Sequence, residues 1–109
     1  MNLKKETKEK IQELQTIEQS LQSILIQKQT FQIELSETEN AFSEVNNSKE
    51  EIYKLVGSIL IKADKESTKK ELKKKQELLS LRLSSIEKQE KDLAKQAGEI
   101  RTQVMKEMN

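Results

Sequence analysis

Two stretches of seven-residue repeat, nearly equal in length, flank a short apolar segment in the middle of the chain. Apolar residues spaced 3.5 positions apart on average keep one helix face turned toward a partner helix, which is typical of a coiled coil. In each stretch eight of the ten positions on that face are apolar. The faces comprise Leu14, Ile17, Leu21, Ile24, Lys28, Phe31, Leu35, Thr38, Phe42 and Val45, and then Leu72, Gln76, Leu79, Leu83, Ile86, Glu90, Leu93, Ala97, Ile100 and Val104. We therefore expect a mainly α fold, a long antiparallel coiled-coil hairpin.

The polar exceptions on the two faces predict how the helices pair. In an antiparallel pair the numbers of facing residues add up to a constant, and a constant of 114 makes Thr38 face Gln76. The same constant puts Lys28 and Glu90 in adjacent layers and centres the hairpin on Gly57. A polar layer of this kind fixes the register at some cost in stability. Constants of 107 and 121 also align the repeats, but they give the polar exceptions other partners, so we expect 114.

The apolar segment between the repeats predicts a short β-hairpin. Valine, isoleucine and tyrosine favour strands, and Gly57-Ser58 suits a two-residue turn. Alternating strand geometry puts large apolar side chains on both faces, and an isolated two-stranded hairpin is marginal in water, with edges that attract other strands. An exposed cap is the alternative, but we favour oligomerisation through the hairpin. The residues assigned to that contact are Ile52, Tyr53, Leu55, Val56, Gly57, Ile59, Leu60 and Ile61.

The length and composition of the chain agree with one thin domain. The chain has 109 residues, of which 36% are charged and 33% hydrophobic, too few apolar residues for an ordinary globular core. Sustained periodicity argues against disorder, the alternative for so polar a chain. We expect a single domain over 1–109, with helix one over 1–46, the hairpin over 50–63 and helix two over 65–108. Asp64 is the expected N-cap of helix two, with Ser67 as the alternative.

At the end far from the hairpin, the seam loses its well-matched pairs. Apolar residues persist there, and methionine suits varied apolar surfaces because its side chain is flexible. Ordinary fraying of the termini is the alternative to a binding role. The candidate binding residues are Leu3, Ile11, Val104, Met105 and Met108.

Several classes of function find no support in the composition. The chain has no cysteine and no histidine, no phosphate-binding loop and no ligand cluster, so we expect no enzyme activity, no cofactor and no metal site. A net charge of +1 gives no general attraction to nucleic acid or to anionic membranes, and the basic run 69–75 is expected to be a solvated face. There is no apolar stretch long enough for a signal peptide or a membrane span, so a cytoplasmic location is expected.

Three segments resemble the prefoldin beta subunit family. The most specific is Tyr53-Lys54-x-Val56-Gly57-x-x-Leu60-Ile61-Lys62, followed by Asp64-Lys65-Glu66. Residues 81–90, LRLSSIEKQE, and residues 26–29, IQKQ, are further matches. The chain departs from the family pattern in a short linker at 46–48 and in a lysine-rich distal end. The archaeal type fits best, and a eukaryotic beta-class subunit is the alternative.

The resemblance implies an ATP-independent chaperone subunit, a holdase. It implies a hetero-hexamer of two alpha and four beta subunits whose hairpins assemble into a β-barrel platform. It also implies that unfolded client proteins bind at the coiled-coil tips and pass to a group II chaperonin. From the residues alone, a structural coiled-coil adaptor or tether that binds one folded partner is the alternative function.

Overall fold

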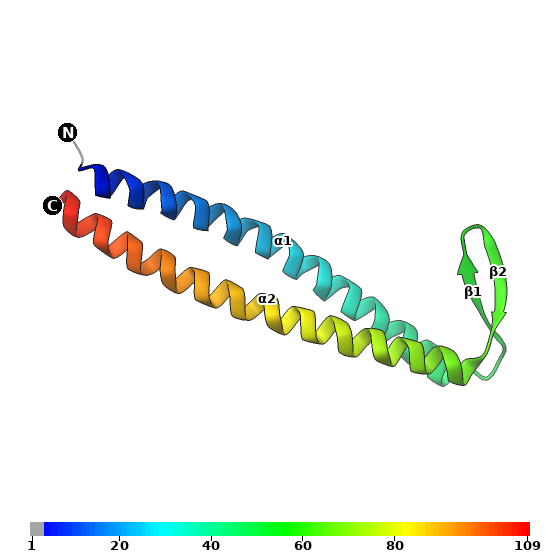
Figure 1. The fold of residues 1–109 in the computed structure, drawn as a ribbon. Coiled ribbons are helices and arrows are strands. Elements are labelled where there is room, and N and C mark those ends of the chain that lie inside the picture. Colours follow the sequence, from blue (N-terminus) through cyan, green and yellow to red (C-terminus); the bar gives the residue numbers. More distant parts are fainter. Residues whose placement is uncertain (1–3) are drawn as a thin grey trace. The chain divides into compact units, whose positions relative to one another are not determined.

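The computed structural model describes residues 4–109 and consists of two helices joined by a hairpin (Figure 1). The elements are α1 (Lys5–Asn47), β1 (Ile52–Val56), β2 (Ile59–Ala63) and α2 (Lys65–Met108). The expected mainly α architecture, with a β-hairpin between two long helices, is confirmed. Helix α1 continues to Asn47, one residue beyond the expected end.

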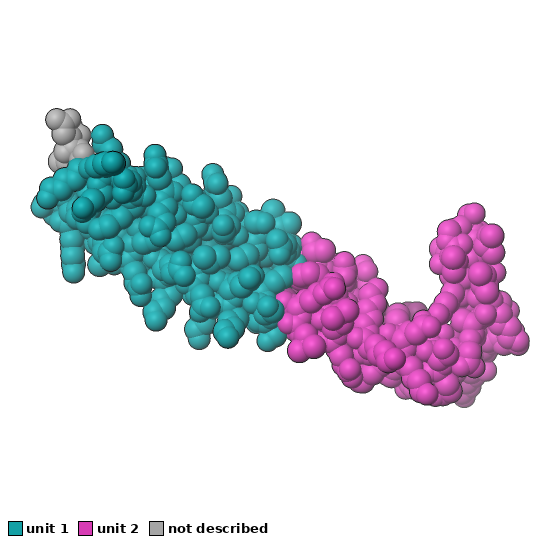
Figure 2. Space-filling model, viewed as in Figure 1, with its two compact units in different colours: residues 1–29, 84–109 teal, residues 30–83 magenta. Residues whose placement is uncertain are grey.

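The chain forms two compact units, each built from parts of both helices (Figure 2). Unit 1 comprises residues 4–29 and 84–109, and unit 2 comprises residues 30–83, including the hairpin. In unit 1 the apolar seam of α1 meets that of α2, which buries Ile17, Ile24, Ile86, Ala97 and Val104. These are seam residues of the heptad pattern, so the repeat correctly identifies the core of this unit.

Unit 2 has a thinner core than unit 1. Among its described residues, the buried ones are Leu79, Thr38 and Thr68, and two of these three are threonines. The Thr38 hydroxyl donates to the Glu34 carbonyl oxygen at 2.7 Å, one turn earlier in its own helix. A threonine hydroxyl inside a helix can hydrogen-bond to a backbone carbonyl of its own helix, so a buried Thr38 needs no hydrogen-bond partner on α2. Gln76 instead donates to Glu39, at 3.4 Å.

Contacts between the helices agree with the expected register in each unit. In unit 1 the Thr7 hydroxyl donates to the Glu107 carboxylate, and these residue numbers add up to 114. In unit 2 Gln76 contacts Glu39, and the Lys73 ammonium lies 5.6 Å from the centre of the Phe42 ring; both pairs add up to 115. The ion pairs Lys10–Glu107, Lys28–Glu90 and Glu18–Arg101 of unit 1 add up to 117, 118 and 119, because long side chains reach past the facing residue. None of these contacts between the helices falls at 107 or 121.

Local hydrogen bonds fix the two ends of the link between the helices and the hairpin. The Ser67 N–H donates to Asp64 Oδ2 at 2.8 Å, which makes Asp64 the N-cap of α2, as expected, rather than Ser67. After α1, the Glu50 N–H donates to the Ser48 hydroxyl at 3.3 Å and turns the chain toward β1. Lys65 also donates to the Ser48 carbonyl oxygen, at 2.5 Å, and so joins the end of α1 to the start of α2.

The hairpin is antiparallel and closes through the expected two-residue turn. Its register pairs Val56 with Ile59 and Leu55 with Leu60, leaving Gly57 and Ser58 in the turn. Gly57 has a φ of 64°, in the left-handed region, whereas Ser58 has no positive φ. A positive φ at the first turn position only is the type II′ pattern, which favours glycine there and matches the twist of the strands.

Candidate assembly and binding surfaces

Both faces of the hairpin carry exposed apolar side chains. Residues paired across the two strands share a face, so Val56, Ile59 and Ile61 lie on one face and Tyr53, Leu55 and Leu60 lie on the other. All six are 51–70% exposed. Within the two strands, Ile52, Lys54 and Ala63 are half-buried, and these three residues share one face of the sheet. Large apolar groups exposed on both sides of a two-stranded sheet are typical of an interface.

Charged side chains pair at the base of the hairpin, and one of these pairs reaches α2. The Lys54 ammonium lies 2.5 Å from Glu71 Oε2 on α2. On the other face of the sheet, Lys62 pairs with Glu51 at 2.9 Å, and the Tyr53 hydroxyl donates to the same carboxylate at 3.3 Å. These polar contacts lie toward the strand ends near the helices. The half of the hairpin nearest the turn is left apolar on both faces.

Where α1 starts and α2 ends, a polar cluster in unit 1 joins the two helices. Thr7 is only 2% exposed, and its hydroxyl donates to Glu107 Oε2 at 2.6 Å. Lys10 forms an ion pair with the other oxygen of the same carboxylate. The hydrogen bond from Lys10, followed by that from Thr7, lowers the pKa of Glu107 below its usual value of 4.5. The helices are thus paired here, although we expected the seam to decay beyond Leu14 and Ile100. We call Thr7, Lys10 and Glu107 the clasp.

The candidate binding residues near the clasp differ in exposure. Val104 is 8% exposed and belongs to the seam, whereas Met105 and Met108 are 62% and 44% exposed. Ile11 is half-buried, and Leu3 lies outside the described residues. Met105 and Met108 are three residues apart on α2, a spacing that puts them on one helix face. Of the described candidate residues, the exposed ones are therefore Met105 and Met108.

Further along unit 1, Lys28 and Glu90 form the expected bridge between the seams. Lys28 Nζ lies 3.1 Å from Glu90 Oε1, and both side chains are partly buried. Arg101 pairs with Glu18 at the same distance, with both side chains more exposed. Exposed pairs of this kind contribute little stability, whereas the Lys28–Glu90 pair satisfies two charges at seam positions.

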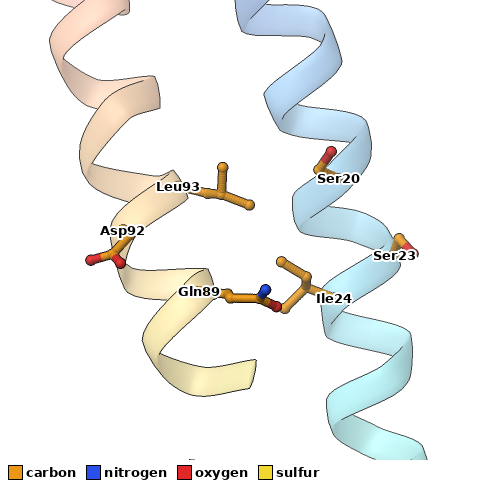
Figure 3. A pocket seen from close by; sticks show the side chains of 6 residues that line it. All are labelled: Ser20, Ser23, Ile24, Gln89, Asp92 and Leu93. Atoms are coloured by element: carbon orange, nitrogen blue, oxygen red, sulfur yellow. The ribbon is translucent and has the colours of Figure 1, made fainter. Parts of the chain in front are cut away.

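A shallow groove opens beside the seam of unit 1, with a volume of about 430 Å³. Figure 3 shows Leu93 and Gln89 extending from α2 toward α1, while Asp92 points away from Ile24. The serines on α1 are too short to fill the space between the helices. The lining residues are Ser20, Ser23, Ile24, Gln89, Asp92 and Leu93. Its open shape and short polar side chains distinguish it from the enclosed, mostly apolar sites that bind small molecules.

Neither a metal cluster nor a membrane span is found in the described part of the chain. Residues 4–109 contain no group of three or more acidic side chains placed to hold a metal ion. None of the helices over the same residues is long and apolar enough to cross a membrane.

The hairpin between paired helices has a close counterpart in a solved structure. The crystal structure of the prefoldin beta subunit from Thermococcus strain KS-1 matches with a TM-score of 0.87 and 33% identity, covering 96% of this chain and 94% of that one. The family model described as prefoldin subunit matches residues 8–109. The chain belongs to the prefoldin subunit family. This is a family of chaperone subunits rather than of enzymes.

Curated prefoldins show the same relationship along most of the chain. Prefoldin subunit beta of Thermococcus onnurineus is 40% identical over 90 residues, which cover 81% of this chain and 78% of the relative. The corresponding protein of Pyrobaculum neutrophilum is 38% identical over 81% of this chain and 71% of its own. That of Saccharolobus islandicus is 35% identical over 101 residues, 91% of this chain and 80% of its own. The expected resemblance to prefoldin beta subunits is confirmed.

The clasp is the part of this prefoldin chain that sequence reasoning missed. Thr7 and Glu107 are a facing pair under the constant of 114, but both are polar, and polar residues at seam positions were read as the loss of the seam. The signal that could have found them is chemical. A hydroxyl faces a carboxylate, and a lysine follows three residues after that hydroxyl.

Proposed function

We propose that the chain is a beta-class subunit of an ATP-independent holdase containing two alpha and four beta subunits. The observation that carries the proposal is the hairpin, with apolar side chains exposed on both faces, in a chain of the prefoldin family. In this proposal residues 1–109 act as a single prefoldin-like domain. The assembly works in the cytoplasm without cofactor, nucleic acid or membrane.

Assembly proceeds through the hairpin. The outer edges of β1 and β2 carry unpaired backbone groups, because the sheet has only two strands. Strands from neighbouring subunits pair with these edges and bury Leu55, Leu60 and Tyr53 on one face and Val56, Ile59 and Ile61 on the other. Closing the sheets into barrels removes the remaining edges, which gives the platform of the proposed hexamer.

Unfolded clients bind at the end of unit 1 that carries the clasp. Met105 and Met108 are exposed there, and opening of the clasp adds Val104 and Ile11. Each contact is weak, but several copies on one platform act together, because binding at one tip raises the effective concentration at the others. The clients are then passed to a group II chaperonin.

The test mixes the purified chain with a prefoldin alpha subunit and measures both mass and chaperone activity. Light scattering is expected to give the mass of two alpha and four beta subunits. The complex is expected to suppress aggregation of a denatured model protein equally well with and without ATP. A complex of the expected mass that leaves aggregation unchanged, yet binds one folded protein, would instead support the adaptor role.

A further inference from the structure

The Glu18–Arg101 ion pair marks one side of the helix pair in unit 1. An Arg101 nitrogen lies 3.1 Å from Glu18 Oε1, so both side chains project to the same side of the seam. A heptad repeat returns a helix to the same face every seven residues. Ile11 lies seven residues before Glu18, and Met108 lies seven residues after Arg101. Ile11 and Met108 therefore share this side, and Met105, three residues before Met108, lies beside them.

Two lysines of α1 lie on the same side as the methionine pair. Lys4 lies seven residues before Ile11, and Lys8 lies four residues after Lys4 and three before Ile11. Both lysines are exposed, and neither forms an ion pair among residues 4–109. We call this surface the methionine flank, and it comprises Lys4, Lys8, Ile11, Met105 and Met108.

The shallow groove marks the opposite side of the seam (Figure 3). On α1, Glu18 directly follows the seam residue Ile17, whereas Ser20, which lines the groove, directly precedes the seam residue Leu21. With 3.6 residues per turn, Glu18 and Ser20 project to opposite sides of the seam. Gln89, which also lines the groove, precedes a seam residue of α2 in the same way. The groove therefore opens on the side away from the methionine flank.

The acidic residues near the clasp gather on the side of the groove. Four exposed glutamates lie one or two whole heptads away from residues that line the groove, so they share its side. These glutamates are Glu6, Glu9, Glu13 and Glu99. The segment 4–13 has no other acidic residue. Apolar side chains and positive charge thus occupy one side of the helix pair near the clasp, and negative charge is concentrated on the other.

We propose that the methionine flank selects unfolded segments in which acidic residues adjoin apolar ones. Apolar side chains of such a segment pack on Ile11, Met105 and Met108. Its carboxylates pair with Lys4 and Lys8, whereas a basic segment meets like charges there, so the two lysines discriminate between clients by charge. The inference rests on the proposed function, because it names the class of client that binds at the end of unit 1 carrying the clasp.

Two fluorescent peptides test this preference. They share one apolar core and differ only in the flanking residues, which are aspartates in one peptide and lysines in the other. Fluorescence anisotropy measures the binding of each peptide to the complex of this chain with a prefoldin alpha subunit. The acidic peptide is expected to bind several-fold more tightly, and the ratio of the two affinities is expected to approach one as salt screens the exposed charges. Equal affinities at low salt would overturn the proposal.

Charge reversal on the methionine flank assigns the preference to its lysines. Lys4→Glu with Lys8→Glu is expected to lower the ratio of affinities several-fold in favour of the basic peptide. The ratio is the readout, because any local opening of the clasp would change the binding of both peptides alike. Light scattering checks that the variant still gives a complex of the expected mass.

The matched control is Lys95→Glu with Lys106→Glu, which makes the same change in net charge at exposed positions of unit 1. Lys106 lies two heptads after Asp92, on the side of the groove, and Lys95 lies midway between the seam residues Leu93 and Ala97 and points outward. The control is expected to keep the natural ratio. An equal change of ratio in both variants would show that only net charge matters and would overturn the proposal.

The apolar part of the contact is tested by Met105→Ser with Met108→Ser. This change is expected to weaken the binding of both peptides. A complex that suppresses aggregation of a denatured model protein but binds both peptides equally would overturn the charge preference alone. A complex that binds neither peptide and leaves aggregation unchanged would overturn the holdase proposal as well.

Discussion

At the scale of single residues, one carboxylate joins the two helices at the far end of unit 1. Glu107 accepts hydrogen bonds from Thr7 and Lys10, and these bonds stabilise its charged carboxylate form. The pKa of Glu107 is therefore lower in the folded state, so Glu107 stabilises the pairing of the helices fully above its usual pKa of 4.5. That contribution is lost as the pH falls through the lowered pKa of the folded state.

Weakening of the clasp is expected to open the helix ends locally. Glu107→Gln at neutral pH should speed amide hydrogen exchange several-fold in the last turns of α2 and the first turns of α1, because a neutral amide is a weaker acceptor. Acidification of the natural chain below the lowered pKa should do the same. Glu99→Gln is the control, since it removes an exposed charge from the same helix. Equal exchange in the two variants would contradict this role for Glu107.

The N-cap of α2 gives a second prediction at this scale. Asp64→Ala removes the acceptor of the Ser67 N–H and is expected to lower the free energy of unfolding by about 1 kcal/mol. Ser67→Ala is the control, because the Ser67 side chain does not cap the helix. Urea unfolding followed by circular dichroism measures both changes. A larger loss from Ser67→Ala would reverse the assignment of the cap.

At the scale of elements, the two glycines are expected to respond in opposite ways to alanine. A Cβ at Gly98 would meet nothing within 4 Å, so Gly98→Ala should stabilise α2 by about 0.5–1 kcal/mol. Gly57→Ala should destabilise the hairpin, because alanine is strained at a φ of 64°. Thermal unfolding of the two variants measures the contrast. Stabilisation by both would mean that the turn does not require its left-handed residue.

The hairpin as an element is expected to control assembly but not helix formation. Ile59→Lys with Ile61→Lys puts two charges on one apolar face of the sheet and should abolish the complex with the alpha subunit while leaving the helical content unchanged. Gln15→Lys with Gln22→Lys adds the same charge on exposed helix positions and should assemble normally. Light scattering and circular dichroism distinguish these outcomes. An unchanged complex in the hairpin variant would place assembly elsewhere.

At the scale of the whole molecule, client protection is expected to depend on the methionine pair. Met105→Ser with Met108→Ser should preserve the mass of the complex and sharply reduce its suppression of client aggregation. Leu25→Ser with Ile26→Ser removes two exposed apolar side chains away from this end and serves as the control. If the control lost as much activity, clients would bind along the helices rather than at their ends.

Periodicity and local chemistry determined how much of the fold could be predicted from the sequence. The spacing of the seams and Gly57 at the centre of the hairpin gave a register near the observed one, although Gln76 contacts Glu39 and not Thr38. Asp64 was enough to mark the start of α2. The clasp escaped because a pattern of apolar positions treats Thr7 and Glu107 as gaps, although a partly buried hydrogen bond joins them.

The clasp also brings the start of α1 and the end of α2 within one hydrogen bond of each other. Neighbouring ends of this kind permit circular permutation. A short glycine-rich peptide joining them, with new ends opened between Gly57 and Ser58, would keep every helical residue and cut only the turn. In that rearranged protein β1 and β2 become the two free arms of the molecule. They would meet only by tertiary pairing, so strand pairing could be studied apart from the covalent turn that now enforces it.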